Sequence, residues 1–129
     1  MQSDPSIDRI TQLEGAFQSL ARSVPGLDVE VVGHVVEDES RVHPVAGFEV
    51  KLQHEEDGAG VALYVSASYA ELTRWSSQAG PLGGSVRERF MVRLSDGWIW
   101  GRTEFDSPDQ LAGELLGYMQ FNLDALSMA

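Results

Sequence analysis

The side chains best suited to forming strong contacts are arginines, tryptophans and a methionine between positions 87 and 102. Asp96-Gly97 is a strong signal for a two-residue hairpin turn. Because side chains alternate along a strand, that turn would place one set of them together on one side of the hairpin. The set comprises Arg87, Arg89, Met91, Arg93, Trp98, Trp100 and Arg102. Arg, Trp and Met are enriched in protein–protein interfaces, so this side is predicted to bind another protein.

In this register Arg93 lies opposite Trp100, a geometry suited to a cation–π contact. Two other interpretations remain open. The arginine stems can cover the indole rings on an ordinary solvated sheet face. Alternatively, a helix covers this face and the tryptophans belong to the core.

Residues for catalysis or metal binding show no matching pattern. The chain has no cysteine, which excludes disulfides, thiolate nucleophiles and cysteine-ligated metals. His34, His43 and His54 fall in or beside different strand-like segments without metal-ligand spacing. The glycine-rich stretch Gly80–Ser85 lacks the lysine of a phosphate-binding loop. We therefore expect a protein without enzymatic activity, metal or cofactor.

The charge balance narrows the classes of partner. Twenty acidic residues against nine basic ones give a net charge of −11, which disfavours nucleic-acid binding. The charge serves solubility or attracts a basic protein. The segment from Asp28 to Asp57 contains nine acidic residues and only two basic ones, Arg41 and Lys51. This acidic segment could complement the arginine-bearing hairpin of a second copy across a two-fold axis. A homodimer is expected on that ground.

No apolar run approaches the roughly 20 residues of a membrane span, and the N-terminus lacks a signal-peptide pattern. We therefore expect a cytoplasmic protein that does not contact membranes.

The spacing of apolar residues along the chain predicts the helices and strands that position these side chains. Apolar residues spaced by three and four predict a first helix that ends before Pro25-Gly26, and Ser107-Pro108 predicts the start of a last one. A capping-box pattern from Ser68 to Glu71 predicts a short middle helix that ends before Gln78. Alternating patterns predict five strands: Leu27–Val36, Val45–His54, Val61–Ala67, Val86–Leu94 and Trp98–Phe105. The order α-β-β-β-α-β-β-α predicts a single α+β domain over residues 1–129, with an antiparallel sheet covered by helices on one face.

Three stretches carry a resemblance to a known family: Val61–Ala67 before the short helix, the hairpin Arg89–Trp100, and the closing helix Asp109–Leu126. In element order, size and acidity the chain resembles the type III secretion chaperone-like fold and the small bacterial regulators thought to share it. The resemblance implies a homodimer that binds an extended segment of a partner protein on its flank, without catalysis. It supplies no site residues.

Together these observations favour a non-enzymatic, acidic protein-binding module of chaperone or adaptor type. One alternative is an immunity protein that neutralises a toxin by covering the basic active site of a nuclease. Another is a small ligand-binding domain or enzyme with a pocket between the last helix and the sheet.

Overall fold

The computed structural model describes residues 5–23, 28–36, 45–54, 58–76, 86–94 and 96–127. Within these ranges the chain forms two helices and seven strands: α1 (Pro5–Ala21), β1 (Asp28–Val36), β2 (Val45–Gln53), β3 (Gly60–Ser66), β4 (Tyr69–Trp75), β5 (Val86–Arg93), β6 (Trp98–Trp100), β7 (Thr103–Phe105) and α2 (Pro108–Ser127). None of the described helices is long and apolar enough to span a bilayer.

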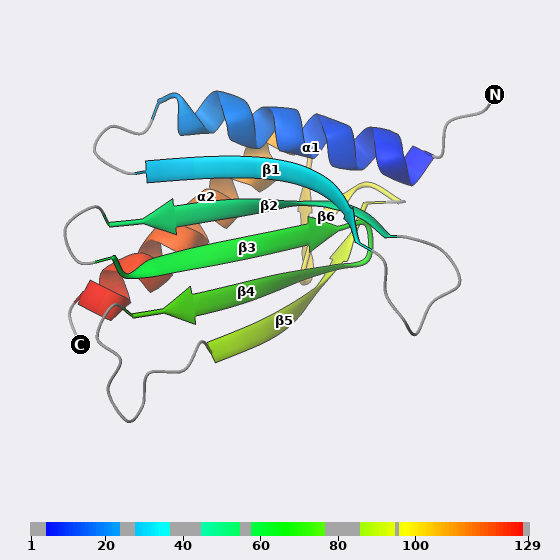
Figure 1. Cartoon of the computed structure of the whole chain (residues 1–129). Helices are drawn as coiled ribbons and strands as arrows, with labels where there is room; N and C mark the ends of the chain where they lie inside the picture. Colours follow the sequence, from blue (N-terminus) through cyan, green and yellow to red (C-terminus); the bar gives the residue numbers. More distant parts are fainter. Residues whose placement is uncertain are drawn as a thin grey trace.

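The strands form one antiparallel sheet in which each strand pairs with its neighbour along the chain, in the order β1 to β7. Both helices pack on the same face of this sheet, where α1 lies along β1 and β2 and α2 crosses behind the strands (Figure 1). The predicted α+β single-domain fold, with an antiparallel sheet and helices on one face, is confirmed.

The core lies between the helices and the sheet. Leu13 and Phe17 of α1 are buried at helical spacing, and Phe17 contacts Phe48 of β2 with 5.5 Å between ring centroids. In the predicted hairpin of β2 and β3, Val50 pairs with Leu63, and both are fully buried. The alternation of the two strands therefore places one apolar row on the helix-covered face, as predicted.

The start of α2 follows its sequence signal. Ser107 Oγ accepts a hydrogen bond of 3.3 Å from the Gln110 backbone N–H, and Gln110 Oε1 accepts one of 3.0 Å from the Asp106 N–H. The first bond satisfies one of the donors that a helix start leaves unpaired, and the second ties the residue before the cap to the first turn of the helix. The apolar side of α2 then buries Leu111, Leu115, Met119 and Leu123.

The prediction of a short middle helix is wrong. Residues 69–75 form β4, which pairs with β3 and β5. Ser66, rather than Ser68, makes the local side-chain bonds. Its hydroxyl donates to the Tyr69 carbonyl (3.0 Å) and accepts from the Tyr69 N–H (3.3 Å), which closes a tight turn between two strands. Hydroxyl groups stabilise turns as well as helix caps, so the spacing alone did not distinguish them.

The prediction of a single last strand is also partly wrong, because residues 98–105 form two strands, β6 and β7. The chain reverses at Gly101 and Arg102, where Gly101 has a φ of +62°, and β6 pairs with β7 from Trp98↔Phe105 to Trp100↔Thr103. Glycine adopts this left-handed conformation without steric cost, so it permits the tight reversal.

Candidate protein-binding surface

The predicted binding residues do not form one surface, because the β5–β6 hairpin pairs one residue out of step with the predicted register. Arg93 pairs with Ile99 and Val92 with Trp100, so the connection is longer than a two-residue turn at Asp96-Gly97. A shift of one residue moves every side chain of a strand to the other face. The predicted opposition of Arg93 and Trp100 is therefore wrong.

The two tryptophans consequently lie on the helix-covered face, where they pack against the core. Trp100 contacts Phe90 with 4.9 Å between ring centroids and Tyr118 of α2 with 6.1 Å. Trp98 lies under Arg9 of α1, whose guanidinium carbon is 5.3 Å from the ring centroid. The interpretation of the tryptophans as core residues, left open by the sequence, is the correct one.

Other predicted residues stay on the opposite face. Arg89, Met91 and Arg93 of β5 are exposed there, with Met91 at 65%. Arg87 pairs with Thr73 of β4, and its side chain lies outside the described part of the structure. Arg102 is exposed in the turn between β6 and β7.

No described helix packs on the face of the sheet that carries Arg89, Met91 and Arg93, which we call the outer face. By strand register and alternation its described residues on β2 to β5 include Glu49, Lys51, Gln53, Ala62, Tyr64, Tyr69, Glu71, Thr73, Trp75, Arg89, Met91 and Arg93.

An aromatic and ionic cluster occupies the outer face where β4 and β5 meet. Arg89 Nε is 3.0 Å from Glu71 Oε2, and its guanidinium carbon is 5.0 Å from the centroid of the Tyr69 ring. Met91 pairs with Tyr69 in the strand register, and Tyr64 lies 5.9 Å from Tyr69 between centroids. Burial, and secondarily the neighbouring Tyr69, raises the pKa of the Tyr64 hydroxyl. This cluster combines residue types that dominate binding hot spots.

Two aromatic side chains of the outer face pack directly against glycines. The Trp75 ring fills the space where a Cβ of Gly60 would be, and Tyr64 does the same at Gly47. Trp75 Nε1 also donates a hydrogen bond of 3.0 Å to the Gly58 carbonyl, which holds the ring against β3. The absence of a side chain at each glycine thus lets these aromatic groups lie close to the neighbouring strand.

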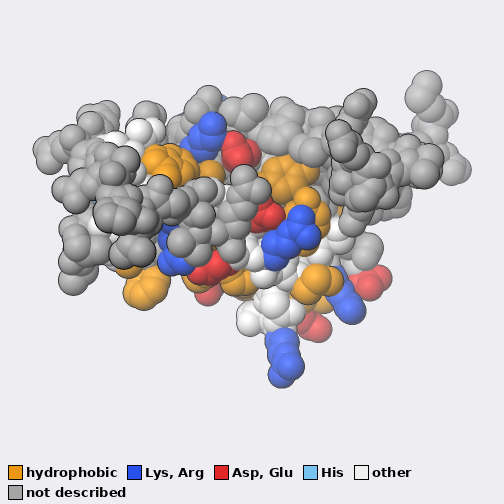
Figure 2. All heavy atoms as spheres, turned by 60° about the horizontal axis from the view of Figure 1, so that its bottom comes forward, with side chains coloured by type: hydrophobic (Ala, Val, Ile, Leu, Met, Phe, Trp, Pro, Cys, Tyr) orange, Lys and Arg blue, Asp and Glu red, His pale blue; other side chains and the backbone are white. Residues whose placement is uncertain are grey.

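Charge on this side of the molecule is mixed. Lys51 Nζ is 3.4 Å from Glu49 Oε1, and Arg89 pairs with Glu71 as described. Viewed from the β5 side, anionic and cationic side chains lie among hydrophobic ones (Figure 2). On the outer face, apolar side chains are therefore accompanied by two ion pairs, and Arg93 adds a further exposed cation.

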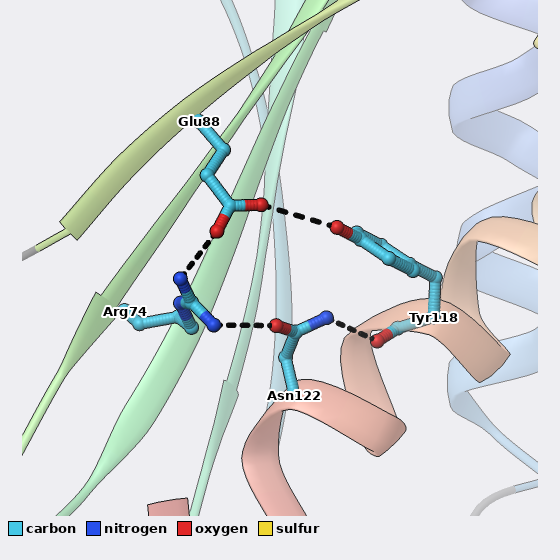
Figure 3. Close-up of polar contacts among 4 residues, drawn as sticks. All are labelled: Arg74, Glu88, Tyr118 and Asn122. Atoms are coloured by element: carbon cyan, nitrogen blue, oxygen red, sulfur yellow. Dashed lines mark hydrogen bonds and ion pairs between the residues drawn. The ribbon is translucent and has the colours of Figure 1, made fainter. Parts of the chain in front are cut away.

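A second polar cluster, on the helix-covered side, ties α2 to the sheet (Figure 3). Arg74 of β4 bonds to Glu88 of β5 and donates to Asn122 Oδ1 over 3.0 Å. The Tyr118 hydroxyl donates to Glu88 Oε2 (3.2 Å), and Asn122 Nδ2 donates to the Tyr118 carbonyl (2.9 Å). Burial first, and then the Glu88 charge, raises the pKa of Tyr118. Because these four residues satisfy one another, we assign the cluster a structural role.

Within the described ranges, no group of three potential ligand side chains comes together at a metal-binding distance. His43 and the side chain of His34 lie outside those ranges. His54 follows β2, and its backbone N–H donates a hydrogen bond of 3.0 Å to the Ala59 carbonyl.

The predicted binding residues did not include Tyr64, Tyr69, Glu71 or Trp75. For β4 the miss follows from predicting a helix there, although buried Ala70 and Leu72 alternate with Tyr69 and Glu71. That period of two was the signal that could have found them.

Comparison with protein-family models, with curated proteins and with solved structures found no match.

Proposed function

We propose that this protein is a non-enzymatic, acidic protein-binding module of chaperone or adaptor type that acts in the cytoplasm and holds a basic partner protein on the outer face of its sheet. The observation that carries the proposal is the cluster of Tyr69, Arg89 and Met91. It presents an exposed apolar side chain beside an aromatic ring that a guanidinium holds in place.

The cluster has the features of an interface anchor. Met91 is unbranched and adapts its shape to a partner, so its exposed side chain can be buried without a large steric cost. Tyr69 supplies a rigid apolar area with a polar tip. Glu71 restrains Arg89 through their ion pair, so less side-chain entropy is lost when a partner covers the cluster.

The choice of a basic partner rests on charge. A net charge of −11 attracts cationic proteins over several ångströms and speeds their encounter. On the outer face, Glu49 and Glu71 are already paired with Lys51 and Arg89, so apolar contact with the Tyr69, Arg89 and Met91 cluster is the main short-range term. The resemblance to secretion chaperones favours an extended segment as the bound part of that partner.

The same charge favours a second candidate function, an immunity protein that covers the basic active site of a nuclease toxin. The two functions differ in what the partner does. The immunity function requires that the purified partner cleave nucleic acid and that this protein stop the cleavage.

The test uses two variants that each add one negative charge. Met91→Glu places it in the outer-face cluster, whereas Gln18→Glu places it on an exposed position of α1. Proteins retained on the immobilised wild-type chain are identified by cross-linking and mass spectrometry, and the candidate partner is then purified and rebound. We expect the partner to bind the wild type and Gln18→Glu but to lose binding to Met91→Glu by about tenfold or more.

Salt provides the second readout. Binding should weaken as sodium chloride rises from about 50 to about 500 mM, because salt screens the attraction between oppositely charged proteins. If no purified protein distinguishes Met91→Glu from Gln18→Glu, the outer face is not the binding surface and the proposal is wrong. A partner of net negative charge would contradict the electrostatic part.

A further inference from the structure

Among the described strands, β5 has a neighbour along its whole length on one side only. It pairs with β4 from Val86 to Met91, whereas its pairing with β6 is limited to Val92 and Arg93. In Figure 1 the side of β5 away from β4 accordingly forms the lower edge of the sheet. We call this side of Val86–Met91 the β5 edge. Such an edge presents backbone donors and acceptors to an extended chain.

The chain leaves the β5 edge at Gly101. The Gly101 N–H donates a hydrogen bond of 3.2 Å to the Met91 carbonyl, and its φ of +62° then turns the chain back toward Thr103 of β7. Within the described ranges no strand continues beside β5 beyond this point. The edge from Val86 to Met91 is about 20 Å long at 3.3 Å per residue, which is enough for a short added strand.

The hydrogen-bond pattern shows which backbone groups point to the β5 edge. The Val92 N–H donates to the Ser68 carbonyl over 3.1 Å, so Val92 and every second residue before it direct their backbone groups toward β4. Arg87 and Met91 belong to the alternate set, whose backbone groups point away from β4. The bond from Gly101 to the Met91 carbonyl agrees with this direction. The edge therefore has the two-residue spacing that another extended backbone matches.

Three aromatic rings lie at or next to β5 on the helix-covered face. Phe90 of β5 is 4.9 Å from Trp100 of β6 and 5.5 Å from Tyr118 of α2 between ring centroids. All three side chains pack against the core but are only partly buried. Side chains of an added strand would alternate between the two faces, so every second one would reach this side of the sheet. Apolar side chains at those positions would cover the exposed parts of the rings.

We propose that the β5 edge binds an extended segment of a partner protein as a further strand, with apolar residues at every second position packed on Phe90, Trp100 and Tyr118. Backbone hydrogen bonds supply the affinity, and the three rings select the alternate apolar side chains. The proposal goes beyond the proposed function, because it concerns the edge of the sheet and the helix-covered face instead of the outer-face cluster around Tyr69.

A second copy of this chain fits the β5 edge less well. Antiparallel pairing of two copies over Arg87–Met91 would be centred on Arg89, so the two Arg89 side chains would lie opposite each other. Like charges directly opposite destabilise a pair of strands. A segment of a different protein avoids this repulsion.

The test starts from peptides, because a short linear segment is sufficient for strand addition. A phage library of random dodecapeptides is selected on the immobilised full chain, and the enriched peptides are synthesised. We expect sequences with apolar residues at every second position and Kd values of about 1–100 µM by isothermal titration calorimetry.

Two variants of one residue test the edge itself. Arg87→Pro removes an edge-directed N–H without removing a hydrogen bond to β4, and sheets tolerate proline at their edges. Arg87→Ala removes the same side chain but keeps the N–H, so it is the matched control. We expect Arg87→Pro to weaken peptide binding by about tenfold or more and Arg87→Ala by less than about twofold. Tyr69→Ala, in the outer-face cluster, should leave peptide binding unchanged, which separates this inference from the proposed function.

Methylation of the peptide backbone, one nitrogen at a time, tests the geometry without changing this chain. Only alternate N–H groups of an added strand donate to β5, so the loss of binding should recur with a period of two along the peptide. This scan decides the matter if Arg87→Pro does not fold. The inference is overturned if no peptide is enriched, if the scan lacks that period, or if folded Arg87→Pro binds as well as Arg87→Ala. Loss of peptide binding in Tyr69→Ala, or self-association of the wild type that Arg87→Pro abolishes, would likewise overturn it.

Discussion

The packing of Trp75 over Gly60 predicts that adding a single methyl group will destabilise the protein. In Gly60→Ala the new Cβ would overlap the Trp75 ring, so the ring must move away from β3. That movement breaks the hydrogen bond of 3.0 Å from Trp75 Nε1 to the Gly58 carbonyl. The mechanism is overpacking against a ring that a polar contact fixes in place.

The magnitude follows from three terms. Overpacking of a well-packed site costs about 1–3 kcal/mol, and a lost hydrogen bond costs about 0.5–1.5 kcal/mol. Replacing glycine by alanine returns about 0.4–1 kcal/mol, because the unfolded chain loses freedom. We expect a net loss of about 2–2.5 kcal/mol in the free energy of unfolding from the midpoints of these terms, equivalent to a Tm lower by about 8–10 °C for a chain of this size.

Urea and thermal unfolding followed by circular dichroism measure this loss. Gly15→Ala is the matched control, because a Cβ there meets nothing within 4 Å in the interior of α1. The same chemical change should stabilise the protein at that site by about 0.5–1 kcal/mol.

A double-mutant cycle tests the stated cause. In a Trp75→Ala background the obstructing ring is gone, so Gly60→Ala should be neutral or slightly stabilising. If Gly60→Ala costs as much without the Trp75 ring as with it, the reasoning is refuted.

Two further predictions concern the helix-covered face. Trp100→Ala should destabilise the protein by about 2–3 kcal/mol, because it removes a partly buried ring from the cluster with Phe90 and Tyr118. Arg93→Ala on the outer face should change stability by less than about 0.5 kcal/mol in urea unfolding, and equal losses would contradict the observed strand register. The raised pKa of Tyr118 favours its neutral form in the folded state, so the corresponding stability is complete below the ordinary value of 10.0 and is lost as pH rises through the folded-state pKa. Tyr118→Phe should therefore make unfolding measured between about pH 9 and 11.5 less dependent on pH, and an unchanged pH profile would contradict this.

The elements with strong periodicity could be predicted from the sequence. The alternation through Phe48, Val50 and Leu63 defined β2 and β3 because one face of each strand is buried and any other register would expose it. The start of α2 was equally clear, since Ser107 caps the Gln110 N–H and the Gln110 side chain bonds back to the Asp106 N–H.

The binding surface could not be predicted in the same way, because it depends on tertiary details. The Asp96-Gly97 pair indicates a turn but does not determine whether two or more residues lie between the paired positions, and this difference moves Trp98 and Trp100 across the sheet. For β4, the helix-like pattern starting at Ser68 competed with alternation over only seven residues, and pairing with strands on both sides decided the outcome.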